Sequence, residues 1–412
     1  FVATLFNAVL VSSAVWQLSR SRWAMLLAFF SWGAMYRFSG SWYEVARVDS
    51  LWSCFVIAAV TALVFFRTKG WQCCLWLAVF CLCLAVFTKQ ATLMLLPFFV
   101  FAVWSWAGFS LALRFSLVLI LLVGLLAAYM QWTSDGWFYF YTMEMGRGHK
   151  FNPGIPMNFL HGDIFLNMPI FVLLSLGFTL LCQPLKRDIL AWSSLFSGFM
   201  VMSLLSRWYA GGYFNVLIPL HMLLLIMGIS GFAVGLKKLY ASDAGVWRYA
   251  LMPLLTLLLM LNIAIGWFNP SGQIPTVADR QCGDAIVNRL SAVKGQVCIS
   301  KHGYLAYLAG KSFCAHEAFA VDVFNGSDAE LARKLVEETY QRIDTGYYQV
   351  LLLDNQAQFA GYGVNFDKLR YTATDLDCPA DSFYPLIRGQ RPLHWLEYNG
   401  SAMVDLRESE VK

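Results

Sequence analysis

Long apolar stretches dominate the first two thirds of the chain, and short polar segments separate them. A helix needs about 20 mostly apolar residues to cross the hydrocarbon core of a bilayer. Stretches near this length recur throughout the region, so the pattern predicts about ten membrane-spanning helices. They cover approximately residues 1–17, 23–37, 50–66, 71–87, 91–107, 111–131, 164–182, 189–206, 213–236 and 249–268.

From Pro270 onward, short apolar runs alternate with charged residues, as in a water-soluble domain. Residues 279–292 and 328–342 have helical patterns, whereas residues 296–300 and 348–354 read as strands. Such alternation favours a small βαβ-type sheet. We therefore predict a polytopic α-helical membrane protein. Residues 1–268 form its transmembrane bundle, and residues 269–412 form a C-terminal α/β domain.

The composition agrees with this division, because apolar residues make up 58% of the chain and charged residues only 13%. Average soluble domains have roughly 45–50% and 25%, so lipid must supply part of the solvent. The net charge of +5 does not indicate nucleic-acid binding. Many of the cations lie in short loops between helices, where Lys and Arg set the orientation in the membrane.

The loop cations predict which end of the bundle faces the cytoplasm. They are Arg20, Arg22, Arg67, Lys69, Arg114, Lys186, Arg187, Lys237, Lys238 and Arg248. All fall on one side of the predicted helices, which the positive-inside rule assigns to the cytoplasm. The opposite side then carries the segments 38–49, 88–90, 132–163 and 207–212. The C-terminal domain is on that side too, so we expect it to be extracytoplasmic.

The chain starts at Phe1, with neither a Met nor a charged segment before the first apolar run. We therefore expect it to be part of a longer protein. Six cysteines lie in or beside apolar helices and are expected to serve packing. Four more are in the C-terminal domain, at positions 282, 298, 314 and 378. An even number permits disulfides outside the cytoplasm, with the pairing left open.

Polar residues on the outer side gather in four places, and two of them are short segments at the ends of helices. Glu44, Arg47 and Asp49 precede the third helix. Asp49 is suited to cap that helix, whereas Arg47 is suited to a phosphate oxygen. Lys89 occupies a tight turn between two apolar helices. It either reaches the membrane interface as a long cation does, or contacts a lipid phosphate.

The other two places are a long loop and the start of a late helix. The loop is rich in aromatic residues and carries Glu144, Arg147, His149, Lys150, His161 and Asp163. His161 and Asp163 are a weak metal-ligand pair, and Asp163 is equally suited to cap the next helix. The fourth segment runs from Arg207 to Asn215. Its glycines allow either close helix packing or a binding site. Together, the four places suit an anionic, lipid-linked substrate.

These segments resemble those of the GT-C class of membrane glycosyltransferases, which contains bacterial aminoarabinose and mannose transferases and the protein O-mannosyltransferases. The matching motifs are the stretches from Tyr43 to Leu51, Phe87 to Gln90, Met143 to His149 and Tyr213 to Pro219. Their order and their positions relative to the helices agree over roughly residues 1–235. The segment from Lys301 to Glu317 resembles the periplasmic domain of some bacterial members. His302 and His316 either have a structural role or contact the acceptor.

The resemblance implies transfer of a sugar from a polyprenyl phosphate to a glycan, lipid or protein acceptor, with inversion at the anomeric carbon. It implies a bacterial inner-membrane location and, in some members, a divalent metal. The family's main carboxylates lie on the first outer loop, which would precede Phe1, so the catalytic base is not identified. The substrate-binding residues that we expect are Arg47, Asp49, Lys89, Glu144, Arg147, His149, Tyr213 and Asn215.

Two other functions fit parts of this pattern. A transporter or flippase of lipid-linked saccharides would also need cations at the outer face. Transporters, however, usually place polar groups at the bilayer midplane, where these helices are almost free of ionisable residues. An oligosaccharide polymerase or ligase also uses a polyprenyl-linked donor and a long outer loop. It should not require a carboxylate pair on the first outer loop.

Overall fold

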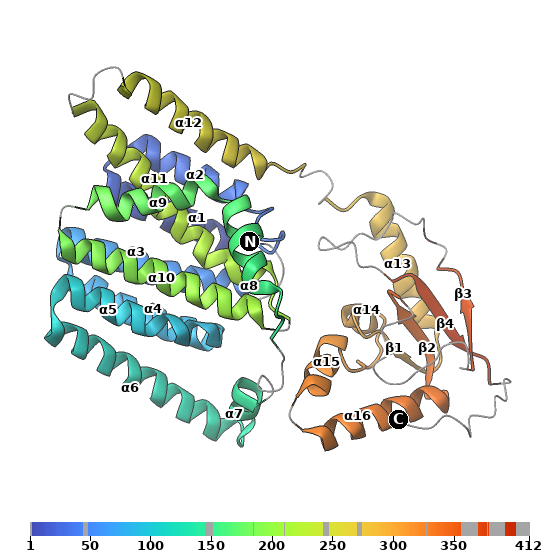
Figure 1. Ribbon diagram of the computed structural model, residues 1–412. Helices are drawn as coiled ribbons and strands as arrows, with labels where there is room; N and C mark the ends of the chain where they lie inside the picture. Colours follow the sequence, from blue (N-terminus) through green and yellow to red (C-terminus); the bar gives the residue numbers. More distant parts are fainter. Residues whose placement is uncertain are drawn as a thin grey trace. The chain divides into compact units, whose positions relative to one another are not determined.

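The computed structural model divides the chain into two compact units (Figure 1). The first unit contains residues 1–138 and 150–268, and the second contains residues 139–149 and 269–412. The structure describes residues 2–43, 48–144, 151–183, 185–209, 211–241, 247–269, 274–326, 328–355, 370–376, 378 and 392–400.

The first unit is built from helices that follow the apolar stretches of the sequence. They are α1 (Val2–Ser19), α2 (Arg22–Ala34), α3 (Asp49–Lys69), α4 (Gln72–Thr88), η1 (Gln90–Leu95), α5 (Leu96–Ala107), α6 (Phe109–Thr133), α8 (Ile155–Asn158), η4 (Phe159–Leu166), α9 (Pro169–Gly177), η5 (Phe178–Cys182), α10 (Lys186–Trp208), η6 (Phe214–Leu217), α11 (Ile218–Ala241) and α12 (Trp247–Ile265). A short helix, α7 (Trp137–Tyr139), and a π-helical turn, η2 (Phe140–Glu144), lie where the units meet along the chain.

Helix α11 is the centre of the bundle. Every residue from Ile218 to Ala233 is buried, and α1, α2, α3, α9 and α10 all contact this helix. A helix that is apolar on all sides needs such an enclosed position. Gly231 allows α9 to come close, because a Cβ at this position would lie 2.5 Å from the carbonyl oxygen of Leu174.

Each predicted membrane span contains a helix, so the polytopic helical architecture is supported. Six described helices are long and apolar enough to cross a membrane. A seventh span would combine the segments Ile155–Leu166 and Pro169–Leu181, which are bent by 84°. Gln72–Thr88 and Tyr249–Ile265 are shorter, and α2 has only 13 residues. By length and composition the described helices therefore supply six or seven spans rather than ten.

The second unit contains a four-stranded sheet with the strand order β1-β2-β4-β3. Its strands are β1 (Gln296–Cys298), β2 (Tyr348–Leu353), β3 (Tyr371–Thr374) and β4 (His394–Tyr398). β1 and β2 are parallel, whereas β4 is antiparallel to both of its neighbours. The helices are α13 (Val277–Ala292), α14 (Gly303–Leu308), α15 (Glu317–Asn325) and α16 (Ala329–Asp344). The two helices and two strands predicted from the sequence are confirmed.

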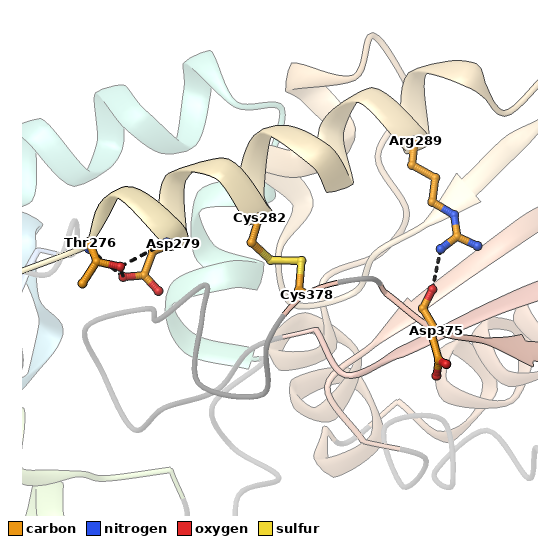
Figure 2. Close-up of a disulfide and its surroundings, with 6 residues drawn as sticks. All are labelled: Thr276, Asp279, Cys282, Arg289, Asp375 and Cys378. Carbon is orange, nitrogen blue, oxygen red and sulfur yellow. Dashed lines mark hydrogen bonds between the residues drawn. A yellow bond between two sulfur atoms is a disulfide. The ribbon is translucent and has the colours of Figure 1, made fainter.

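Two disulfides join segments of the second unit. Figure 2 shows that Cys282 on α13 is bonded to Cys378, which follows β3. The second disulfide joins Cys298, at the end of β1, to Cys314. Thr276 and Asp279 form a capping box at the start of α13, so the helix that carries Cys282 begins at a fixed point.

Candidate functional site

The carboxylate of Asp49 is the centre of the candidate site. Asp49 is the first residue of α3, and its side chain is only 2% exposed. Its Oδ1 accepts hydrogen bonds from Lys89 Nζ at 2.7 Å and from Asn215 Nδ2 at 2.8 Å. A helix N-terminus is a favourable place for a negative charge. Asp49 therefore links the ends of three segments, rather than acting only within its own helix.

Lys89 follows directly after α4, where the backbone changes from helical to extended. Besides its bond to Asp49, its ammonium group lies 4.6 Å from the centre of the Trp52 ring. The indole N–H of Trp52 in turn donates to Thr92 Oγ1 at 2.7 Å. An aromatic face and a carboxylate both attract a cation. The ammonium group is thus positioned by its partners, while the side chain remains 21% exposed.

Asn215 reaches Asp49 from η6, the 3-10 turn that leads into α11. Its side chain is buried, which explains why its amide makes a hydrogen bond inside the bundle. Tyr213, two residues earlier, is 42% exposed and stacks on Trp42 at a ring distance of 6.2 Å. The segment before α11 thus supplies the hydrogen-bonded amide of Asn215 and the exposed ring of Tyr213.

A second ion pair involves the same turn. Arg207, in the last turn of α10, donates from Nε to Asp163 Oδ2 at 3.0 Å and from Nη1 to the carbonyl oxygen of Gly212 at 2.7 Å. Its guanidinium group also lies 4.7 Å from the centre of the Phe214 ring. A Cβ at Gly212 would lie 2.0 Å from the carbonyl oxygen of Ser206, so the glycine is required for this close approach.

A small cavity lies beside this turn. It has a volume of about 310 Å³ and is lined by Arg37, Phe38, Gly40, Asn167, Phe214 and Ile265. Its lining joins the segment after α2 to the start of α11. Neither Arg37 nor Asn167 was a predicted site residue, because neither stands in a dense polar cluster of the sequence.

A buried polar contact also escaped the sequence analysis. His221, on α11, is fully buried, and its Nδ1 lies 3.1 Å from Ser39 Oγ. The signal in the sequence was a single histidine in an otherwise apolar helix. A charged or strongly polar group in such a helix requires a partner.

The other predicted site residues are not brought to Asp49 by the described contacts. Glu144 ends η2, which belongs to the second unit. Arg47, Arg147 and His149 lie outside the described residues. The structure therefore unites Asp49, Lys89 and Asn215, with Tyr213 adjacent along the chain.

Asp163 was one of two candidate metal ligands in the sequence, with His161. In the structure its carboxylate forms an ion pair with Arg207. Within the described ranges, no group of three or more His, Cys, Asp and Glu side chains is arranged to hold a metal ion.

The two candidate histidines of the C-terminal domain have different surroundings. His302 Nε2 lies 2.8 Å from Asp354 Oδ1, just beyond the carboxyl ends of β1 and β2. Burial, and then the negative charge of Asp354, raise the pKa of the neighbouring Tyr304. His316 accepts a hydrogen bond from the backbone N–H of Ala318 and caps α15. A local structural role therefore accounts for His316.

Comparisons with protein-family models, curated proteins and solved structures find no match to this chain.

Proposed function

We propose that this protein is a membrane glycosyltransferase. In this proposal, the enzyme moves a sugar from a polyprenyl-phosphate donor to an acceptor on the extracytoplasmic face. The observation that carries the proposal is the Lys89 ammonium group, which Asp49 and Trp52 hold at one end of the helical bundle. A cation that is fixed in advance can neutralise a phosphate leaving group without reorganising during the reaction.

The partners of Lys89 favour this role over simple exposure of a long side chain to the interface. A lysine that only reaches towards water does not need a buried carboxylate and an aromatic ring on its two sides. The hydrogen bond to Asp49 orients the ammonium group, so Asp49 acts as a positioning residue. Asn215, from η6, completes the set because it donates to the same carboxylate oxygen.

The position of the site along the helices favours a transferase over a transporter. Asp49 begins α3, Lys89 follows α4, and Asn215 precedes α11, so all three lie at helix ends. Transporters usually place their polar groups near the bilayer midplane, on broken helices. A site at the membrane surface suits a reaction between a lipid-anchored donor and an acceptor from water.

The disulfides of the C-terminal domain favour an extracytoplasmic location for that domain. Its two disulfides persist in oxidising compartments and are rare in the cytoplasm. By resemblance, the catalytic carboxylate would come from the first outer loop of the bundle. It would act as a general base on the acceptor.

Transfer from a radiolabelled donor tests the proposal directly. Membranes containing the full-length protein would be incubated with polyprenyl-phosphate mannose or aminoarabinose, and the labelled acceptor would be extracted and counted. We expect Lys89→Ala and Asp49→Asn each to abolish transfer while both variants still insert into the membrane. Lys69→Ala, at the opposite end of α3, is the matched control and should retain transfer.

Two results would contradict the proposal. Transfer at the wild-type rate by both variants would return Lys89 and Asp49 to purely structural roles. Movement of the intact donor across a vesicle bilayer, without any sugar transfer, would favour a flippase instead.

A further inference from the structure

A second cavity lies at the opposite end of the bundle from the Asp49 site. It has a volume of about 390 Å³, and Arg67 and Asp188 are among the residues that line it. Arg67 follows Asp49 by 18 residues on the same helix, which corresponds to about 27 Å along its axis. That distance is close to the thickness of a bilayer's hydrocarbon core. The cavity is therefore at the other membrane face, which the loop charges predict to be cytoplasmic.

The ion pair in this cavity leaves hydrogen-bond donors available. Arg67 donates from Nε and Nη2 to the two carboxylate oxygens of Asp188, at 2.7 and 3.0 Å. A guanidinium group has five N–H donors, so three remain after these two bonds. Those three have no partner among the residues that the structure describes. Asp188 thus orients Arg67, while part of the guanidinium group can still bind an anion.

Two buried polar atoms of the cavity lining also have no hydrogen-bond partner in the described part of the chain. They are Oε1 of Gln17 and the indole Nε1 of Trp106. Gln17 is 2% exposed and Trp106 is 7% exposed. Buried polar groups are normally paired, and leaving them unpaired is unfavourable. A bound polar ligand would provide the missing partners.

The charge of the lining is positive, because Arg20 adds a cation to the balanced Arg67 and Asp188 pair. Arg20 directly follows α1 and has a left-handed backbone, with a φ of 52° that glycine adopts more easily. A cationic side chain therefore stands at a position where the backbone alone would favour glycine. Its guanidinium group lies 5.6 Å from the centre of the Trp16 ring, and the side chain is exposed.

Apolar and aromatic residues form the rest of the lining. Trp106 packs edge-on against Trp192, and Phe178 packs against the same indole at a ring distance of 5.2 Å. Aromatic rings of this kind gather at the level of the lipid headgroups. The charged residues of the lining suit a lipid headgroup, and the aromatic and aliphatic residues suit the start of its acyl chains. A free anion would need only the charged residues.

We propose that this cavity binds the phosphodiester headgroup of an anionic phospholipid from the cytoplasmic leaflet. Arg20 and the remaining donors of Arg67 would bind the phosphate oxygens, and the Trp106 N–H would donate to a headgroup oxygen. Basic pockets between transmembrane helices on this side of a membrane recognise such headgroups. The proposal does not depend on the glycosyltransferase function.

Native mass spectrometry of the purified full-length protein tests the proposal. The protein would be titrated with phosphatidylglycerol, with phosphatidylcholine and with inorganic phosphate. We expect one phosphatidylglycerol to bind more tightly than either of the others. Arg20→Gln should weaken that binding on the order of tenfold, as expected for a lost charge-assisted hydrogen bond. Trp106→Phe, which keeps the ring, should weaken it less.

Arg22→Gln is the matched control, because Arg22 is an exposed cation two residues away that does not line the cavity. It should bind phosphatidylglycerol like the wild type. Equal binding of phosphatidylglycerol and phosphatidylcholine, or wild-type binding by the Arg20 and Trp106 variants, would overturn the proposal. Inorganic phosphate binding as tightly as phosphatidylglycerol would assign the cavity to a free anion and would also overturn it.

Discussion

Separating Lys89 from Asp49 tests whether the two groups act as a unit. At an effective dielectric constant of 20 and the 2.7 Å separation of Nζ and Oδ1, their direct attraction is about 6 kcal/mol. Desolvation of both charges offsets much of this attraction. The informative quantity is therefore the change in the free energy of unfolding when one partner or both partners are removed.

The two single substitutions should differ, because the two side chains differ in exposure. Lys89→Met leaves a carboxylate that is 2% exposed inside the bundle, so it should cost about 3–5 kcal/mol. Asp49→Asn leaves an ammonium group on a side chain that is 21% exposed and can reach water. It should cost only about 2 kcal/mol. The double variant buries no charge at this point, and should cost less than Lys89→Met alone.

Unfolding by sodium dodecyl sulfate in mixed micelles, followed through the fluorescence of the 16 tryptophans, measures these values. Lys69→Met, an exposed lysine at the other end of α3, is the control and should change the free energy of unfolding little. If the two single losses add to give the loss of the double variant, Lys89 and Asp49 do not interact energetically. The two groups would then not form a unit in the site.

Three further predictions concern the packing, the disulfides and the orientation. Gly231→Ala should lower the free energy of unfolding by about 1–3 kcal/mol, because the new Cβ would meet the backbone of α9. Gly33→Ala has open space and should gain up to about 1 kcal/mol; the opposite order in thermal melts would contradict the packing. Cys282→Ser should leave the Cys378 thiol free to react with maleimide, and should lower the free energy of unfolding by about 2–5 kcal/mol. Labelling of both Cys282 and Cys378 in the oxidised wild type would refute the pairing. An impermeant maleimide should reach the exposed Cys73 in inside-out vesicles and not in intact cells, and the reverse pattern would invert the topology.

The sequence predicted the helices well, because each apolar stretch is long enough to define its own structure. It overestimated the number of full spans, since α2 is apolar yet has only 13 residues. Local patterns also identified two of the strands, β1 and β2, and two of the helices, α13 and α16, of the C-terminal domain. Pairing of its four cysteines could not be chosen, because spacing alone allows three connectivities.

The candidate site was predicted only as separate residues. Asp49, Lys89 and Asn215 stood out as polar groups beside apolar helices, but 40 and 166 residues separate Asp49 from its two partners. A carboxylate at the start of a helix also fits a local cap, so the sequence could not distinguish the two roles. Only the tertiary arrangement brings the three groups to one point.

The ion pairs of Arg67 and Arg207 illustrate the same limit. From the sequence, Arg67 was interpreted only as a loop cation that sets the orientation in the membrane. Its partner in the bidentate contact, Asp188, lies 121 residues away. Asp163 was interpreted as a cap or a metal ligand because its partner, Arg207, lies 44 residues away. In each case the residue types were visible, whereas the partner depends on how the helices pack.

The most direct test of the proposed function is the release of polyprenyl phosphate from a labelled sugar donor by the full-length protein. We predict that the wild type releases polyprenyl phosphate in step with transfer of the sugar. We also predict that Lys89→Arg, which keeps the cation, retains part of this activity, whereas Lys89→Ala releases none. Equal release by Lys89→Ala and the wild type would contradict the assignment of Lys89 to the donor phosphate. If the wild type released no polyprenyl phosphate from either donor sugar, the proposed function itself would be contradicted.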